Sequence, residues 1–518
     1  MTAVSHPGFP ARSGCGAQAM LARAAWAACA GLVALPVAAQ NAGALRITPV
    51  LDSSVSVINS TLPALQGQGN DVVLQVHPGV QMTVGSRRLR GTLDYGLNLI
   101  HHTNPVPGQG RADSLQNNLN AVLNAELIER WAYLDASATV AQQAISAYGQ
   151  QSVDGVQSNT NRTEVSQLSI KPYARGNLAG WATYQVGLSA DASHSKNGQA
   201  ADSRSLGGNL TVGSSNAGAL FGWSAQASQQ RSSFSGGQAT DNGRLTASLL
   251  FKPHPEWSGS LRGGQETTAV GNVYSQTYSN WGGDVRWTPS ARTTASLSAD
   301  ERYFGRAHQV LLEHRFPSSS VRFTSSRDVN NAANGAGVGQ PTTMYQLFYA
   351  QFASVQPDPA LRDQLVRATL LALHLDPNAV VAGGFANAGT TVQQRQDLSL
   401  TYVGLRSSYT VQAFTSDVRR LDTANEGFDT TPVRQDGWTT TWSYRLTPTS
   451  NVNLTGSRLR TQGTATQAGN QLKSAALNWS NQLSKYTATS VSARYSVFDG
   501  SINPYRESAL SVTLTLRF

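Results

Sequence analysis

Arg, Asp and Glu residues occupy alternate positions in several segments whose intervening residues are apolar, as Arg90 and Asp94 do. Such groups suit two kinds of chemistry. Opposite charges pair across neighbouring strands and hold a sheet rigid, whereas Arg binds carboxylate and phosphate groups through its planar fork. Hydroxyl and amide groups beside them would hydrogen-bond sugars. If these polar faces line the inside of a closed sheet, the residues that would line its lumen are Arg90, Asp94, Glu126, Arg262, Glu266, Asp284, Arg286, Asp300, Arg302, Arg445, Arg494 and Arg517.

Signals for catalysis or metal binding are weak. The chain contains no GxSxG, HExxH or P-loop pattern, and its glycine-rich stretches lie in hairpins without a following helix. His101 and His102 are adjacent, and neighbouring strand residues face opposite ways, so they make a poor pair of ligands. We expect His308 and His314 to be hydrogen-bonded strand side chains. The sequence therefore predicts no enzyme, no catalytic residue, no metal site and no cofactor.

The elements that position these residues are strands with one apolar and one polar face. The last segment, 509–518, places Leu510, Val512 and Leu514 on one face and Ser511 and Thr513 on the other, because strand side chains alternate with period two. The same alternation recurs in 89–99, 115–127, 438–446 and 490–497.

The connections between these segments alternate in length. Short turns occur near positions 85, 129, 176, 214, 252, 288, 317, 404, 447 and 482, and mostly longer Gly/Asn/Ser-rich stretches lie between them. One link, FGRA at 304–307, is short where a long loop is due. This pattern predicts a transmembrane antiparallel β-barrel of about 22 strands, with 18 or 20 also allowed and with the short turns in the periplasm.

Aromatic residues near the proposed turns support a membrane-spanning wall. A soluble β-sandwich would also alternate, but it would not need so many consecutive long hairpins with unequal connections. It would also not place aromatics at strand ends as interfacial girdles do. The residues concerned are Trp131, Trp181, Trp257, Trp281, Trp287, Trp438 and Tyr486.

Composition fits an exported protein. Residues 1–39 read as a signal peptide with an apolar run from Ala24 to Ala38, and Met20 is an alternative start. Both cysteines, Cys15 and Cys29, fall in this segment, so the mature chain (40–518) would contain no disulfide. The net charge is +9, but the Lys and Arg residues form no basic run. This distribution argues against nucleic-acid binding.

Residues 328–392 form an unusually long connection within the barrel domain. Inside it, Leu361, Leu365 and Ala368 keep helical spacing, Asp358 is placed to cap a helix, and Asp376-Pro377 would end it. Tyr345, Phe348, Tyr349 and Phe352 also keep helical spacing. We expect a helical insertion that either packs on itself over the mouth of the barrel or folds into the lumen as a constriction.

Three stretches resemble a known group of proteins: SADERYFGRAHQVLLEHRF (298–316), PDPALRDQLVRATLLALHLDPN (357–378) and HPGVQMTVGSRRLRGTLDYGLNL (77–99). The chain resembles the outer-membrane β-barrel proteins associated with the PEP-CTERM/exosortase system, which are found beside exopolysaccharide biosynthesis genes. The resemblance implies an outer-membrane location and a role in polysaccharide export, with polysaccharide and periplasmic export components as partners.

The chain end carries a further resemblance. Leu514, Leu516 and Phe518 resemble the signal by which barrel-assembly machinery recognises its clients, although Leu516 stands where an aromatic is often seen. Three functions remain open: a channel for exopolysaccharide export, a porin or solute-specific uptake channel, and a structural or adhesive barrel with a closed lumen. In each the wall contacts outer-membrane lipid.

Overall fold

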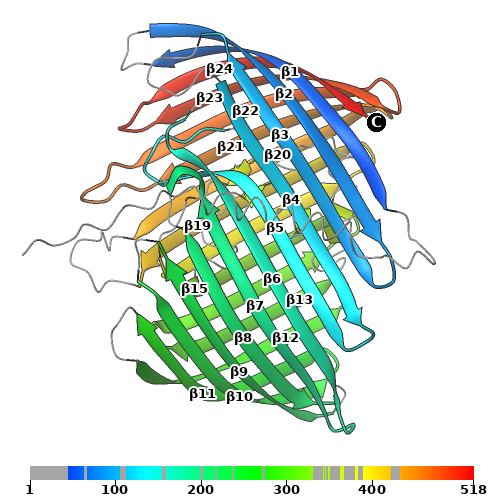
Figure 1. Cartoon of the computed structure of the whole chain (residues 1–518), viewed down its shortest axis with the longest axis vertical. Helices are drawn as coiled ribbons and strands as arrows, with labels where there is room; N and C mark the ends of the chain where they lie inside the picture. Colours follow the sequence, from blue (N-terminus) through cyan, green and yellow to red (C-terminus); the bar gives the residue numbers. More distant parts are fainter. Residues whose placement is uncertain are drawn as a thin grey trace, which may run out of the picture.

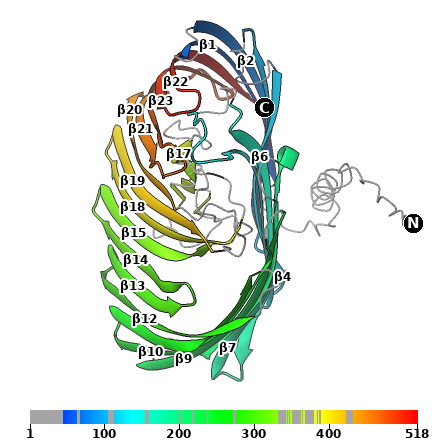
Figure 2. The same cartoon turned by 90° about the vertical axis from the view of Figure 1, so that its left-hand side faces the viewer.

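The computed structural model shows one closed antiparallel barrel (Figures 1 and 2). The structure describes residues 45–62, 67–104, 113–153, 159–198, 202–215, 219–235, 238–270, 275–330, 389–421 and 432–518, with isolated positions between 342 and 385. The proposed signal peptide lies outside the described residues, as do Phe352, Asp358, Leu361, Ala368 and Asp376-Pro377. No helix among the described residues has the length and apolar character needed to cross a bilayer.

Twenty-two strands form the wall, which confirms the strand number that the sequence predicts. Each strand pairs with its neighbour in the chain, so the order around the barrel follows the sequence. The strands are β1 (Arg46–Leu62), β2 (Gly67–Gly85), β3 (Leu89–His102), β4 (Asp113–Ile128), β5 (Ala132–Ala144), β6 (Arg162–Leu178), β7 (Ala182–Ser195), β8 (Ser203–Ser214), β9 (Phe221–Phe234), β10 (Thr240–His254), β11 (Trp257–Val270), β12 (Gln276–Ser290), β13 (Thr293–Arg302), β14 (Gly305–Arg315), β15 (Ser319–Asn330), β18 (Thr391–Val403), β19 (Ser407–Arg420), β20 (Val433–Thr447), β21 (Ser450–Thr461), β22 (Asn470–Gln482), β23 (Thr487–Asp499) and β24 (Tyr505–Arg517).

The last strand closes the barrel against the first. β24 pairs with β1 from Arg517 opposite Val50 to Arg506 opposite Thr61, and the backbone N–H of Phe518 donates to the carbonyl of Pro49 at 3.0 Å. Because a bilayer core offers no water to hydrogen-bond an open edge, a spanning sheet must close in this way. The pairing of the C-terminal segment with the first strand, which the sequence predicts, is confirmed.

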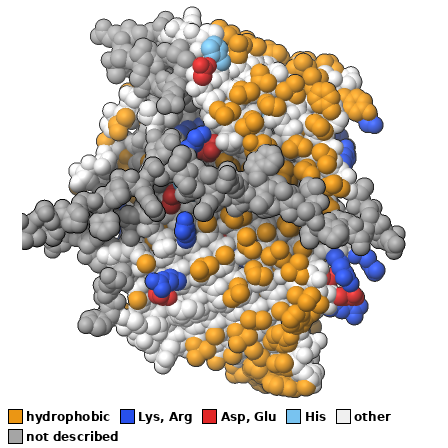
Figure 3. All heavy atoms as spheres, in the orientation of Figure 1, with side chains coloured by type: hydrophobic (Ala, Val, Ile, Leu, Met, Phe, Trp, Pro, Cys, Tyr) orange, Lys and Arg blue, Asp and Glu red, His pale blue; other side chains and the backbone are white. Residues whose placement is uncertain are grey.

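Apolar side chains cover the outside of the wall. Leu510, Val512 and Leu514 are exposed along β24, and Leu261 on β11 is 73% exposed. The residues between them, such as Ser511 and Arg262, face the interior. Figure 3 shows the resulting hydrophobic surface over the strands. An apolar exterior of this kind is stable against lipid and not against water.

The two ends of the barrel differ in their connections. Ten turns of two to six residues lie at the end where the chain enters β1 and leaves β24; we call this the turn end. The opposite loop end carries mostly longer connections. One exception is the tight hairpin at Tyr303 and Phe304 between β13 and β14, the short link that the sequence indicates. In outer-membrane barrels the short turns are periplasmic.

Exposed aromatics mark the ends of the apolar surface. All seven of the girdle residues that the sequence predicts are exposed. Trp257 and Trp287 stack at the turn end with ring centroids 5.4 Å apart, and the indole N–H of Trp131 donates to the hydroxyl of Tyr184 at 2.9 Å. Their amphipathic rings suit the level of the lipid headgroups.

The long insertion is slightly shorter than the sequence indicates. Positions 328–330 extend β15 and positions 391–392 begin β18, so the connection runs from 331 to 390. Two short strands within it, β16 (Thr342–Thr343) and β17 (Val380–Ala382), pair with each other. A 3-10 turn, η2 (Lys196–Gly198), follows β7. β17 lies inside the ring of strands in Figure 2.

The exposed C-terminal aromatic provides a test of assembly. Phe518 is 69% exposed and faces outward, so Phe518→Ala should change the stability of the folded barrel little. If the residue serves as a recognition signal, the variant should accumulate much less folded protein in the outer membrane. Leu510→Ala, on the same face of β24, is the matched control, and an equal loss in both variants would contradict the prediction.

Candidate functional site in the barrel interior

All twelve candidate interior residues lie on the inward face of the wall. Residues directly opposite each other in neighbouring strands share a face, and the register places Ser260, Asp284 and Ser298 side by side. The exposed apolar residues Leu261, Val285 and Leu297 occupy the other face of the same strands. The structure then divides the twelve residues into a paired group and a group near the turn end.

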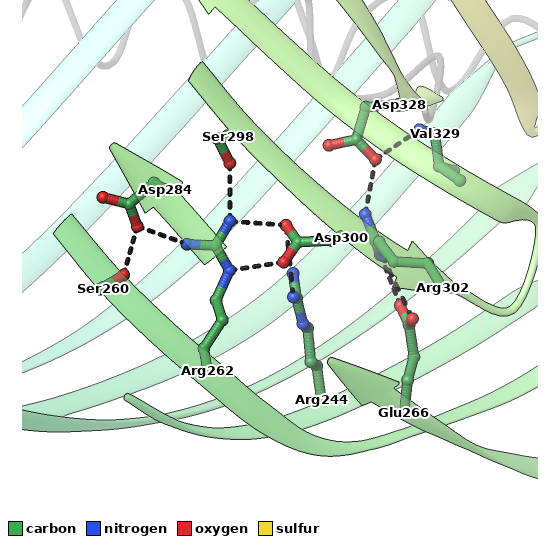
Figure 4. A network of polar contacts seen from close by, with 10 residues as sticks. All are labelled: Arg244, Ser260, Arg262, Glu266, Asp284, Ser298, Asp300, Arg302, Asp328 and Val329. Atoms are coloured by element: carbon green, nitrogen blue, oxygen red, sulfur yellow. Dashed lines mark hydrogen bonds and ion pairs between the residues drawn. The ribbon is translucent and has the colours of Figure 1, made fainter. Parts of the chain in front are cut away.

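The paired group centres on Arg262 of β11 (Figure 4). Its guanidinium donates from Nε to Asp300 Oδ1 at 2.5 Å and from Nη1 to Asp284 at 2.7 Å. A third bond, from Nη2, reaches Ser298 Oγ at 2.6 Å. Ser260 donates to Asp284, and Arg244 of β10 approaches Asp300 at 4.0 Å. This cluster joins the inner faces of four consecutive strands.

Arg302 of β13 makes a second set of contacts beside the first. It donates to both oxygens of Glu266 on β11 and, at 2.5 Å, to Asp328 on β15. Glu266 is only 2% exposed, so its charge depends on Arg302. Burial raises the pKa of Tyr303, in the adjoining turn, to about 12, so that side chain adds no charge. These contacts extend the network from β10 to β15.

A separate buried pair stands beside the barrel closure. Arg494 of β23 donates to Glu507 of β24, whose side chain is 1% exposed. Sequence reasoning missed Glu507, Arg244 and Asp328, although the first two occupy inward positions that strand alternation could have identified. Asp328 was assigned to the long connection and therefore was not placed on a strand.

The histidines are held by hydrogen bonds. His101 contacts Asp113 at 2.6 Å and His102 contacts Asp71 at 2.7 Å, so the two rings have different carboxylate partners. His308 and His314 contact hydroxyls of Ser325 and Thr293. Within the described part of the chain, no cluster of three His, Cys, Asp or Glu residues is arranged to hold a metal ion.

A loop crosses the interior at the loop end. Residues 145–153 follow β5, yet the carbonyl of Ala147 accepts from Thr461 on β21 at 3.1 Å and from Asn470 on β22 at 2.9 Å. The hydroxyl of Tyr505 on β24 donates to the carbonyl of Gln151 at 2.9 Å. Since β5 and β21–β24 are separated by several strands around the wall, this loop spans part of the lumen. The sequence indicated only a polar connection here.

Asn161 gives the crossing loop its shape. Its side chain accepts from the N–H of Ser146 at 2.9 Å and donates to the carbonyls of Ser146 and Gln150 at 2.8 and 3.1 Å. Val153 packs against the buried cluster of Leu472, Phe498 and Tyr505. The loop is therefore an ordered segment attached to the wall.

Described parts of the insertion also cross the interior. Phe385 forms a β-bridge with Ala144 at the end of β5, and Thr390 lies 3.3 Å from Thr240 at the start of β10 through their Oγ1 atoms. β17 contacts β20. These described positions contact the wall at β5, β10 and β20, so these parts of the insertion lie within the ring of strands.

The aromatic residues of the insertion pack on one another. Tyr345 stacks on Tyr349 with centroids 5.7 Å apart, and Arg362 lies over the Tyr349 ring at 4.8 Å. The Tyr345 hydroxyl donates to Asp363, which is 2% exposed. The helical positions described here thus form a self-packed body. The choice between a lid over the mouth and a constriction in the lumen therefore stays a prediction.

Comparison with known proteins identifies the fold and no family. No protein-family model matches the chain, and no curated protein does. Among solved structures, the FrpB iron transporter of Neisseria meningitidis matches with a TM-score of 0.51 for its F3-3 variant, at 8% identity, over 93% of this chain and 82% of that one. Its F5-1 variant matches with a TM-score of 0.50, at 9% identity, over 92% and 83%. This likeness shows an outer-membrane type of β-barrel fold.

The buried ion pairs should contribute to stability. Arg302→Met leaves the buried carboxylate of Glu266 without its hydrogen-bonded guanidinium, with only Arg244 opposite it, which we expect to lower the free energy of unfolding by about 3–5 kcal/mol. Arg302→Met combined with Glu266→Met should recover most of this loss. Urea unfolding in lipid vesicles, followed by tryptophan fluorescence, measures both.

Arg286→Met is the control for that experiment. Arg286 also faces inward but is exposed, so its replacement should change the unfolding free energy by less than about 0.5 kcal/mol. A similar loss in Arg286→Met and Arg302→Met would show that the buried network contributes no more to the free energy of unfolding than an exposed arginine does.

The crossing loop should restrict ion flow. Thr461→Ala with Asn470→Ala removes both side-chain donors to the Ala147 carbonyl and leaves the Tyr505 contact in place, so the loop should move more freely and single-channel conductance should rise. Ser457→Ala, an inward hydroxyl of β21 that contacts only Ser474 among the described hydrogen bonds, should leave conductance unchanged. Equal conductance in the wild-type protein, the double variant and Ser457→Ala would contradict a constricting role for the loop.

Proposed function

We propose that this protein is an outer-membrane channel that assists export of an exopolysaccharide. The observation that carries the proposal is the interior: a closed 22-stranded wall lined by hydroxyl, amide and guanidinium groups and crossed at one mouth by two anchored segments. A wall of this size encloses a wide lumen unless loops fill it. Polar groups along it favour hydrated cargo over apolar cargo.

The resemblance to PEP-CTERM-associated barrels supports the choice of cargo. Pairing of the wall charges would leave the passage rigid, and the many Ser, Thr, Asn and Gln residues would exchange hydrogen bonds with sugar hydroxyls. The barrel-assembly machinery and periplasmic export components are the partners that this function requires.

A closed surface barrel is the second candidate. It is favoured by the crossing loop and by the described position Phe385 of the insertion, both of which contact the wall at the loop end. In that case the protein would bind polymer externally and pass no current. An uptake channel would instead conduct small ions steadily and leave secretion unaffected when deleted.

Deletion and complementation test the export role. A strain lacking the gene should lose most of its surface polysaccharide, and the wild-type gene should restore it. A Thr240→Cys/Thr390→Cys variant should restore secretion only under reducing conditions, because the disulfide would pin the end of the insertion to β10. The mature chain has no cysteine that would compete.

Ser457→Cys/Ser474→Cys is the matched cross-link. These hydroxyls lie 2.6 Å apart on neighbouring strands, so their disulfide joins two wall strands without touching the insertion and should leave secretion normal. Unchanged polysaccharide in the deletion strain would overturn the proposed export function. Equal secretion by the oxidised and reduced Thr240→Cys/Thr390→Cys variant would show that this end of the insertion need not move.

A further inference from the structure

The net charge of the protein is concentrated at the turn end. Fourteen of the 39 Lys and Arg residues lie within four positions of the ten short turns, or at the start of β1 and the end of β24. Only five of the 30 Asp and Glu residues do so. The rest of the chain carries 25 of each. The excess of nine positive charges at this end therefore equals the net charge of the whole chain.

These cations fall into two sets according to direction. Arg87, Arg130, Arg292, Arg406 and Lys485 lie in the turns themselves, where they can reach lipid phosphates. A second set lies on inward strand positions, separated from the membrane by the wall. We call the second set the collar; it holds Arg90, Arg175, Arg445 and Arg517 of the fourteen, together with the deeper inward cations Lys171 and Arg286, which lie eight and five positions from the nearest short turn.

Inward carboxylates also lie near the collar, among them Asp52 of β1 and Asp94 of β3, and several others have partners of their own. Asp284 is held by Arg262, and Glu313 lies 3.8 Å from Arg322. Glu126 and Asp135 remain close to the collar, with Asp135 accepting from Asn124 at 2.7 Å. The residues within four positions of the turns nevertheless keep an excess of positive charge, in contrast to the network at β10–β15, where three arginines meet four carboxylates.

An aromatic pair lies within the collar. Tyr133 and Tyr173 face inward on β5 and β6 and stack with centroids 5.1 Å apart. The Arg175 guanidinium lies 4.5 Å from the centroid of the Tyr133 ring, which holds this cation at the mouth. Phenol hydroxyls and ring faces contact sugar rings, while the guanidinium fork binds carboxylates.

We propose that the collar is a binding site for a carboxylate-bearing polysaccharide at the periplasmic mouth of the lumen. This inference rests on the proposed export function and names its substrate class. Positive charge in a recess raises the local concentration of a polyanion and its rate of entry, and the effect weakens with salt. A neutral glycan would gain nothing from this positive charge.

Polyanion binding to the purified full-length barrel in vesicles tests the site directly. The probe is polygalacturonate, with neutral dextran of matched length as the control polymer, and binding is measured by calorimetry at two salt concentrations. Polygalacturonate should bind with an affinity that falls as salt rises, and dextran should not bind. In planar bilayers, polygalacturonate should reduce the current when added on the turn side only.

Two variants with equal charge loss separate the collar from the rim. Arg175→Gln/Arg286→Gln/Arg445→Gln should weaken polygalacturonate binding by roughly tenfold, because exposed ion pairs are individually weak and three are lost. Arg292→Gln/Arg406→Gln/Lys485→Gln removes three cations from the turns and should change it less than about twofold. Vesicles of anionic and of zwitterionic lipid show whether headgroups compete for either set.

The outcomes are distinct from those of the secretion test. Equal weakening by both triple variants, or equal binding of dextran, would overturn the collar as a site. If polygalacturonate binds as expected but deletion leaves secretion intact, the collar stands and the export function fails. If deletion abolishes secretion but only dextran binds, the export function stands and its cargo is neutral.

Discussion

The structure depends on one constraint, that every backbone N–H and C=O within the membrane must be satisfied by the sheet itself. Pairing of β24 with β1 meets it, because closure leaves no edge. Closure also fixes which face of each strand points inward. Once Leu510 and Val512 face lipid, Ser511 must face the lumen, and the register passes this choice from strand to strand around the wall.

A closed wall of 22 strands creates a second problem, since its interior is too wide for wall side chains to fill. Segments that cross the loop end occupy part of this space, and a network of ion pairs joins β10–β15. The carbonyl of Ala147 reaches donors on β21 and β22, and Phe385 reaches β5. At the turn end, Arg90, Arg175, Arg286 and Arg445 are instead exposed.

Sequence periodicity predicts the strands of the wall but does not predict the contacts of the segments inside the barrel. Alternation predicts the strands, the closing pair and the inward position of Arg262 or Arg494, because period two is a local property. It does not predict that Ala147 meets Asn470, because that contact depends on the cross-section of the whole barrel. The same limit applies to Thr240 and Thr390, which lie 150 residues apart.

Charge illustrates how topology changes the meaning of composition. Along the chain the cations are thinly spread and form no basic run, yet successive hairpins bring Arg90, Arg175 and Arg445 to one end of the lumen. Arginine therefore has two roles that differ by depth. Deep in the wall, Arg262 and Arg302 form ion pairs with carboxylates and contribute rigidity. At the mouth, Arg286 and Arg445 are exposed, and we propose that they bind a carboxylate ligand, so stability and the proposed cargo selection reside in different residues of one type.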